Sequence, residues 1–510
     1  MGGLKLVSME RIGKLCEDTK RLVIYGAGTV SNILYLYLKS KGLSEKIQCF
    51  AVTKRENNPY YKYGLEVLEA EDAVQLYRDA LVLVGVQNIL SEAIREYLTA
   101  LQYENYEFID VESLIHIFYD RLYRSPIQKN KIIFSNMKDM GYGGNPKYIA
   151  EELLKSDLEK RLDLVWVVSQ QKYSFPKGIR TVETGTFEYY YELATAHMWV
   201  DNTRKNFDAR KRRGQYYIQT WHGAAPIKKV EKDAEGSLPK SYVANAKKDS
   251  EMADVFLSGS KFYTELYRKS FWYDGPILKV GLPRHDVFWK GEVIRRKVFQ
   301  HFGLMEEKCM VLYAPTFRKD FTNQYYDIDF TAVLSALTKR FGREFVLAVS
   351  KHPDNRYLEY DFAQKDFIAV DRYDDFEELL KAADVLISDY SGCMYDFSYT
   401  RRPVFLYQRD YESYKEDRDF YVPMEELPYI KAYSNEELVR RIEEFDMAAY
   451  QKRLDTFMDG MGNYDDGTAS KKVSKYIWGI LDKMTLSISE ENANAESIMF
   501  ALSQDSSCER

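Results

Sequence analysis

Short apolar runs alternate with longer helical stretches along most of this chain, and that alternation decides its fold class. A helix between two strands carries the chain back to the starting edge, so the strands pair in parallel. Beyond residue 131 the runs are too numerous for one compact sheet. We therefore predict two doubly wound sheets that divide near residues 292–300, with a ligand-binding cleft between them. Their predicted strands are 131–135, 164–168, 197–200, 217–220, 255–258, 278–280, 310–313, 345–349, 367–370, 385–388 and 404–407.

A separate α/β unit precedes these sheets. A strand ending at Tyr25 runs into the turn Gly26-Ala27-Gly28 and then into a helix, which is how a dinucleotide-binding fold begins. The fingerprint is incomplete, because Ser31 replaces the third glycine and Thr53 stands where a ribose-binding carboxylate is expected. We predict a Rossmann-like domain. A plain strand-to-helix connection explains its glycine turn at least as well as nucleotide binding does. Its predicted strands are 21–25, 47–52 and 81–84.

Composition excludes several classes of function. The formal net charge of −6 over 510 residues leaves no overall positive field for nucleic acid. Basic patches at 210–213, 228–229 and 401–402 usually form solvated faces, with an anionic ligand or a lipid surface as the alternative. The five cysteines are scattered without metal-binding spacing, which favours a reducing cytoplasm. No signal peptide and no apolar run of roughly 18 residues occurs. We predict a cytoplasmic protein, with peripheral membrane contact left open.

Residues 216–226 hold the first candidate for chemistry. Aromatic and β-branched residues run into Trp221-His222-Gly223, and the glycine lets the backbone approach a neighbour closely. Ligands of open α/β sheets bind at the carboxyl ends of the strands, where this histidine is expected to lie. A lone histidine is more often structural than catalytic, so a catalytic His222 needs supporting groups from other strand ends.

Three other strand ends carry cations suited to phosphate. Two strands leave through a proline and then present an arginine: Arg284 follows Gly281-Leu282-Pro283, and Arg318 follows Pro315. A third strand is followed by Ser350-Lys351-His352. Guanidinium groups bind phosphate oxygens in a bidentate manner, and phosphoryl transfer needs such neutralisation together with a base for the attacking hydroxyl. The pattern therefore favours an anionic phosphate substrate.

The last strand end is Ser388-Asp389-Tyr390-Ser391-Gly392. A helix starting here points unsatisfied N–H groups and a partial positive charge at the predicted cleft, which favours a phosphate. Asp389 would repel a phosphate that it faced, so we expect it to accept a hydroxyl or to cap the helix. An ordinary N-cap explains the stretch equally well when taken alone. The chain has no glycine-rich loop followed by Lys-Ser/Thr, so we predict no ATPase. The carboxylate pair Asp327 and Asp329 follows a loop-like stretch and does not resemble a metal-binding cage, and we predict no metal and no cofactor.

In their order and spacing these motifs resemble those of the CDP-glycerol glycerophosphotransferases that polymerise teichoic acid. The resemblance covers roughly residues 131–483 and implies an α/β fold of GT-B type, in which two Rossmann-like halves face a cleft, behind the extra N-terminal domain. The predicted segments are 1–125, a Rossmann-like domain of unassigned role; 126–300, the acceptor-side half; 301–483, the CDP-donor half; and 484–510, a disordered tail. The motifs are Gln219-Thr220-Trp221-His222-Gly223, Gly281-Leu282-Pro283-Arg284, Tyr313-Ala314-Pro315-Thr316-Phe317-Arg318 and Ser388-Asp389-Tyr390-Ser391.

The resemblance also implies a reaction. Glycerol phosphate, or a related polyol phosphate, moves from a CDP-linked donor to a hydroxyl of a growing cell-surface polymer or a lipid-linked primer, and CMP leaves. The implied partners are therefore CDP-glycerol or another CDP-polyol and an anionic polymer or lipid-linked acceptor. His222 is implied as the base and His352 as a second catalytic histidine. The implied substrate-binding residues are Trp221, Gly223, Gly281, Pro283, Arg284, Arg318, Ser388, Asp389, Ser391 and Gly392.

The chain departs from the family pattern in three places. His285 stands where asparagine is frequent, Gly392 replaces a second serine after Ser391, and the residues around His352 differ. These changes bear on which polyol phosphate is recognised. Two alternatives remain: a GT-B glycosyltransferase that uses a nucleotide sugar, and a polymer-binding scaffold without catalysis.

Overall fold

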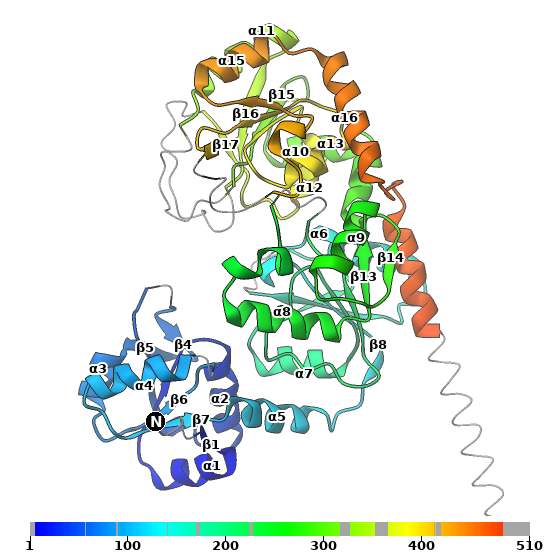
Figure 1. Ribbon diagram of the computed structural model, residues 1–510. Coiled ribbons are helices and arrows are strands. Elements are labelled where there is room, and N and C mark those ends of the chain that lie inside the picture. The colour runs from blue at the N-terminus through cyan, green and yellow to red at the C-terminus, as the bar shows by residue number, and fades with distance from the viewer. Residues whose placement is uncertain are drawn as a thin grey trace, which may run out of the picture.

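Three mainly parallel β-sheets follow one another along the chain and lie in three successive units (Figure 1). The computed structural model describes residues 6–482, except 57, 88–89, 140, 170–173, 224–227, 317–326, 352–365, 413 and 415–419. Every strand predicted from the sequence is present, with ends that shift by up to three residues. The predicted α/β class, with two doubly wound sheets behind an extra α/β unit, is confirmed.

The first unit has the predicted strand–glycine turn–helix start. Gly26 adopts a φ of +116°, and a Cβ there would lie 2.8 Å from the carbonyl oxygen of Gly85. Backbone conformation and close packing are therefore enough to require a glycine at this position. One strand pair, β4–β5, is antiparallel. Across the sheet the strands are β1 (Leu6–Val7), β7 (Tyr106–Ile109), β6 (Leu81–Val84), β2 (Leu22–Tyr25), β3 (Ile47–Val52), β5 (Leu65–Glu69) and β4 (Tyr61–Lys62). The helices are α1 (Met9–Asp18), α2 (Thr29–Ser40), α3 (Ala70–Leu76), α4 (Ser91–Ala100) and α5 (Val111–Leu122).

The second unit is a fully parallel sheet with an almost continuous apolar core. Its central strands are buried on both faces, which is why they read as unbroken apolar runs. Across the sheet the strands are β10 (Ile179–Glu183), β9 (Asp163–Val168), β8 (Gln128–Ser135), β11 (Ala196–Asp201), β12 (Tyr216–Gln219), β13 (Val255–Ser258) and β14 (Ile277–Lys279). The helices are α6 (Gly144–Ser156), α7 (Phe187–Thr195), α8 (Lys240–Met252) and α9 (Lys261–Ser270), and the 3₁₀ helix η5 (Pro283–Trp289) follows β14.

The third unit repeats this design with a six-stranded parallel sheet. Across it the strands are β17 (Ile368–Ala369), β16 (Phe345–Val349), β15 (Cys309–Tyr313), β18 (Val385–Ser388), β19 (Val404–Tyr407) and β20 (Ile430–Ala432). The helices are α10 (Val293–His301), α11 (Phe330–Phe341), α12 (Phe376–Ala382), α13 (Cys393–Ser398), α15 (Asn435–Glu443) and α16 (Met447–Met461).

The chain crosses between the second and third units twice. Val287 and Val298 pack in the core of the third unit, although they precede the predicted boundary at residue 300. The last helical segment, 469–482, returns to the second sheet (Figure 1). Its residue Ile477 is fully buried against that sheet's strands. The exact limits of the three domains stay a prediction. No helix in the described part of the chain is long and apolar enough to cross a bilayer.

Candidate functional site

A strained turn at the end of β12 carries the candidate histidine. Trp221 has a φ of +54°, in the left-handed region that costs a bulky residue roughly 1 kcal/mol or more. The Oε1 atom of Gln219 accepts a hydrogen bond from the Trp221 backbone N–H at 2.9 Å and so helps to hold the turn. Backbone strain of this kind persists only where the surrounding structure holds it, and the residue that follows Trp221 is His222.

His222 is held in one tautomer. Its Nδ1 donates to the backbone carbonyl of Asn202, at the end of β11, at 2.8 Å. A carbonyl only accepts, so Nδ1 carries the proton and the neutral ring keeps a lone pair on Nε2. The residue remains exposed to solvent, yet the dense protein around the ring, and secondarily the guanidinium groups of Arg284 and Arg204, lower its pKa to about 4. His222 is therefore a neutral acceptor near pH 7.

The predicted glycines of the site are explained by close packing. A Cβ on Gly223 would lie 2.6 Å from the Tyr263 hydroxyl. Gly281 has a φ of +89°, and a Cβ there would lie 2.9 Å from Oδ1 of Asp465. Both glycines bring backbone against a polar side chain, and no larger residue fits without displacing it. Pro283 starts η5 at the position where a missing N–H has no cost.

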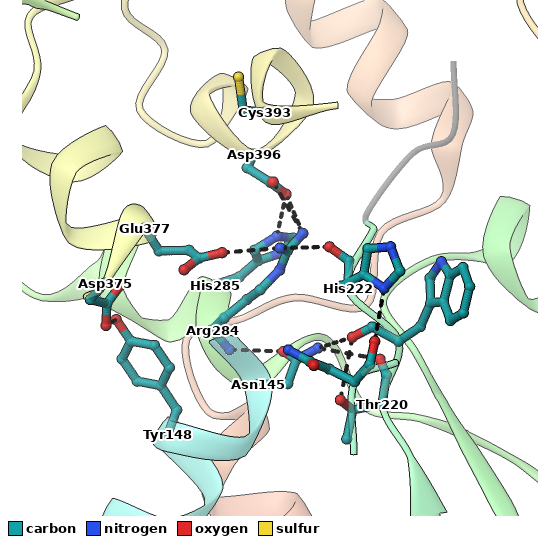
Figure 2. A network of polar contacts seen from close by, with 12 residues as sticks. Asn145, Tyr148, Thr220, His222, Arg284, His285, Asp375, Glu377, Cys393 and Asp396 are labelled. Carbon is teal, nitrogen blue, oxygen red and sulfur yellow. Dashed lines mark hydrogen bonds and ion pairs between the residues drawn. The ribbon is translucent and has the colours of Figure 1, made fainter. Parts of the chain in front are cut away.

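Arg284 is buried and forms hydrogen bonds and ion pairs with other protein groups. Its Nη2 donates to both carboxylate oxygens of Asp396, at 2.9 and 3.0 Å, and its Nη1 donates to Glu377 at 3.0 Å and to the carbonyl of His222 at 2.9 Å (Figure 2). Among the described residues its Nε has no hydrogen-bond partner. The guanidinium of Arg284 therefore links the backbone carbonyl of His222 to two carboxylates of the third unit.

His285 continues the same buried charge network. Its Nε2 lies 2.8 Å from Oδ1 of Asp396, and its Nδ1 lies 3.2 Å from Oδ2 of Asp465. Burial alone would lower its pKa, but the carboxylates of Asp465 and Asp396 raise it to about 9. The imidazolium therefore persists at neutral pH and bridges α13 to the segment after α16. An asparagine at this position would carry no charge between the two carboxylates.

A second buried ion cluster joins the two halves beside Arg284. Lys147, on α6, pairs with Asp375 and, at 3.1 Å, with Glu378, both at the start of α12. Asp375 also caps α12 through the N–H of Glu378 and accepts the Tyr148 hydroxyl at 2.8 Å. The site region is thus built where the second and third units are held together by fixed charges.

The strand end after β18 splits into a buried and an accessible part. The Ser388 hydroxyl donates to the carbonyl of Ala314 at 2.6 Å, and the Asp389 carboxylate accepts the N–H and hydroxyl of Thr316 at 2.9 to 3.1 Å. Asp389 therefore accepts a hydroxyl, as expected, but from the loop after β15. Gly392 starts the short helix α13 without a side-chain cap and is exposed, and Ser391 is partly exposed.

The predicted residues Arg318 and His352 lie outside the described residues. Of the others, the structure joins His222 and Arg284 directly. Sequence reasoning did not name three side chains that hold this pair, Asn145, Glu377 and Asp396. It named Gln219 as part of the Trp221-His222-Gly223 motif but assigned it no role. The signal for Asn145 was the pair Gly143-Gly144 just ahead of it, which marks a close approach of backbone at a helix start.

Comparison with known proteins gives a consistent picture. The family model described as CDP-Glycerol:Poly(glycerophosphate) glycerophosphotransferase matches residues 117–479, more than half of the chain. The teichoic acid poly(glycerol phosphate) polymerase of Staphylococcus epidermidis is 29% identical over 69% of this chain. The chain spans about half the length of that relative, 51%, and 49% of the Bacillus subtilis protein of the same name.

Other relatives are matched over more of their length. The teichoic acid glycerol-phosphate transferase of Staphylococcus aureus is 27% identical over 72% of this chain and 97% of its own. The ribitol-phosphate polymerase TarL of that species is 24% identical over 89% of this chain and 79% of its own. A solved structure of the wall teichoic acid polymerase TagF is 26% identical, with a TM-score of 0.65 over 78% of this chain and 98% of that chain.

Proposed function

Because the chain belongs to the CDP-glycerol:poly(glycerophosphate) glycerophosphotransferase family, we propose that it transfers glycerol phosphate, or a related polyol phosphate, from a CDP-linked donor to an acceptor hydroxyl and releases CMP. The observation that carries this proposal is the state of His222. Its neutral ring has its proton fixed on Nδ1, and Nε2 bonds to no described residue. A general base for an attacking hydroxyl needs that form of the ring.

The proposed step has a simple bond balance. Nε2 of His222 takes the proton of the acceptor hydroxyl while the oxygen forms a bond to the β-phosphorus of the donor. The bond from that phosphorus to the bridging oxygen breaks, and CMP leaves with the electron pair. A base with a pKa of about 4 is weak, but a bound diphosphate brings negative charge that raises this pKa toward neutrality.

Arg284 takes a positioning role in this proposal. Its guanidinium pairs with Asp396 and Glu377, so it acts on the reaction through the carbonyl of His222 that it holds at 2.9 Å. We assign the CDP moiety to the accessible start of α13, at Ser391 and Gly392, together with Arg318 and His352. Backbone N–H groups and cations of this kind neutralise a transferring phosphoryl group.

The test is a donor panel read by the nucleotide released. The purified chain is incubated with CDP-glycerol, CDP-ribitol or nucleotide sugars, each with and without a polyol-phosphate acceptor. We expect CMP from one CDP-polyol, at a rate that rises with acceptor. The variant His222→Asn is expected to bind the donor and to lose CMP release by at least about 100-fold. Release of a nucleoside diphosphate from a nucleotide sugar would replace this proposal with glycosyl transfer.

The acceptor is proposed to be an anionic polymer or a lipid-linked primer reached from the cytoplasmic face of the membrane. Sedimentation with anionic vesicles at low and high salt tests the membrane part, because contact through surface charges weakens as salt screens them. Equal sedimentation with anionic and neutral vesicles would contradict an electrostatic contact. A comparison of CMP release with glycerol-based and ribitol-based acceptors identifies the polyol of the acceptor.

A further inference from the structure

The side chain of Asn145 is buried at the meeting point of three elements. It lies in the first turn of α6 and is 1% exposed. Its Nδ2 donates to the carbonyls of Trp221 at 3.0 Å and Thr220 at 3.2 Å, and its Oδ1 accepts the backbone N–H of Arg284 at 3.1 Å (Figure 2). One amide therefore bonds the turn before His222 and the start of η5.

The carbonyls that Asn145 bonds lie beyond the sheet. The last residue of β12 in register with both neighbouring strands is Gln219, and the next N–H, that of Thr220, still donates to Asp201 at 2.7 Å. The carbonyls of Thr220 and Trp221 then have no strand to accept from. A buried carbonyl without a partner costs about 1–3 kcal/mol, and the same peptide unit carries the left-handed strain of Trp221. Asn145 donates to both carbonyls in the strained conformation, and the hydroxyl of Thr220 adds a longer hydrogen bond, of 3.3 Å, to the carbonyl of Trp221.

The position of Asn145 is itself set by two glycines. A Cβ on Gly143 would lie 2.7 Å from the carbonyl oxygen of Asp374, and a Cβ on Gly144 would lie 2.7 Å from Nδ2 of Asn202. Asn202 is the residue whose carbonyl fixes the tautomer of His222. The glycines thus let α6 start against both the third unit and the loop that orients the histidine ring.

We propose that Asn145 is a positioning residue for His222, one that locks the Trp221 turn so that Nε2 of the histidine points in a single direction. The proposal rests on the proposed function for its kinetic consequence, but the orientation of the ring does not depend on turnover. A displacement of about 1 Å at a reacting group can cost 100-fold in rate. Loss of Asn145 therefore lowers kcat, while donor binding, which uses other groups, is maintained.

The experiment compares Asn145→Ala with Asn245→Ala. Asn245 is a matched control, because its Nδ2 also donates to a backbone carbonyl in the same unit, but to that of Lys205 at 2.7 Å and not to the carbonyls of Thr220 and Trp221. In CMP-release assays we expect kcat of Asn145→Ala to fall about 10- to 100-fold with KM for CDP-glycerol within threefold of the parent. Asn245→Ala keeps kcat within threefold. Asn145→Ser, with one hydroxyl donor, is expected between them and carries the comparison if the alanine variant does not fold.

A second readout follows the ring without substrate. In ¹⁵N-histidine NMR, with the His222 signals assigned by loss in His222→Asn, the parent is expected to show a single tautomer protonated on Nδ1. Asn145→Ala is expected to show averaged Nδ1 and Nε2 shifts, and Asn245→Ala the parent pattern. An Asn145→Ala or Asn145→Ser protein with parent-like kcat and parent-like shifts overturns the proposal. So does a fall in kcat with unchanged shifts, which would mark a structural role only.

These outcomes separate the two proposals. If the parent releases no CMP from any donor, the proposed function fails, and the tautomer comparison alone then supports or overturns the role of Asn145. If the parent is active and the two alanine variants behave alike in both assays, the proposed function stands and the positioning role fails.

Discussion

At the scale of single residues, the chemistry of His222 leads to a dependence on pH. The pKa of this histidine is lowered to about 4 in the free protein, and a bound donor diphosphate raises it through its negative charge. A base works only when unprotonated, so activity rises as pH increases through its pKa. We expect the acid limb of kcat/KM, which reports the free protein, at a lower pH than the acid limb of kcat, which reports the donor complex. Rate measurements from pH 4 to 8 test this, and coincident limbs near pH 6.5 would contradict it.

His285 makes stability depend on pH in the opposite direction. Its pKa is raised to about 9 in the folded protein, against about 6.5 in an unfolded chain. The stabilisation by the imidazolium is therefore fully present below pH 6.5 and is lost as pH rises through 9. The free energy of unfolding should fall with a limiting slope of about 1.4 kcal/mol per pH unit in that window. Urea unfolding from pH 6 to 9 should show this slope in the parent and not in His285→Asn; equal slopes would exclude His285 as the titrating group.

Residue identities were easier to predict than residue partners. The motif Trp221-His222-Gly223 lies at a strand end, as its pattern indicates, because apolar runs and glycines are local signals. The carboxylate partners of Arg284 were not predictable in the same way. Its carboxylate partners Glu377 and Asp396 lie 93 and 112 residues further along the chain, on helices whose sequences do not single them out. Only the fold brings these charges together.

At the scale of elements, central strands were predictable from local sequence patterns, whereas several strands at or near the sheet edges were not. The central strands of all three sheets contain buried apolar runs and were predicted. The missed strands are β10, β7, β20, β5 and the two-residue strands β1 and β4. Most of these mix polar residues with apolar ones, as in Ile179–Glu183, which lies at the edge of its sheet with one side open. Short polar edge strands resemble loops in sequence, so their pairing depends on the neighbour that the fold supplies.

The contact between α6 and α12 permits a stability prediction. The ammonium group of Lys147 is 5% exposed and lies between the carboxylates of Asp375 and Glu378. Removal of one partner from a buried ion pair leaves uncompensated charge and costs about 3–5 kcal/mol. We expect Lys147→Met to lose that much stability in urea unfolding, and the double variant Lys147→Met/Asp375→Asn to regain part of it. A double variant less stable than the single one would mean that charge is not the cause.

At the scale of the whole molecule, the basic patch at 210–213 joins units. In the patch 210–213, Arg210 pairs with Glu112 of α5 at 2.7 Å, Lys211 with Asp254 at 2.6 Å, and Arg212 donates to the carbonyl of Ser125 at 2.9 Å. These contacts fasten the first unit and its connection to the second sheet. Charge patterning in the sequence indicated a solvated or ligand-binding face, because the two carboxylates and the carbonyl that meet these cations come from three separate stretches of chain.

The last helical segment gives the most direct test of how the units depend on one another. Residues 469–482 follow the third unit but pack on the second sheet, and just before them Asp465 accepts the N–H of Leu282 at 2.7 Å and pairs with His285. Ile477 is fully buried in that contact, and Lys475 on the same helix is exposed.

We expect Ile477→Ala to cost about 2–5 kcal/mol, as large-to-small core substitutions do, and Lys475→Ala to stay within about 0.5 kcal/mol of the parent. Because the segment ties the second unit to the third, the loss should also appear in calorimetry, as a second unit that melts before the third. A single transition shifted as a whole would mean that the buried charges at Arg284 and Lys147 suffice to couple the two units. Equal stability of the two variants would mean that the helix is not part of the core it covers.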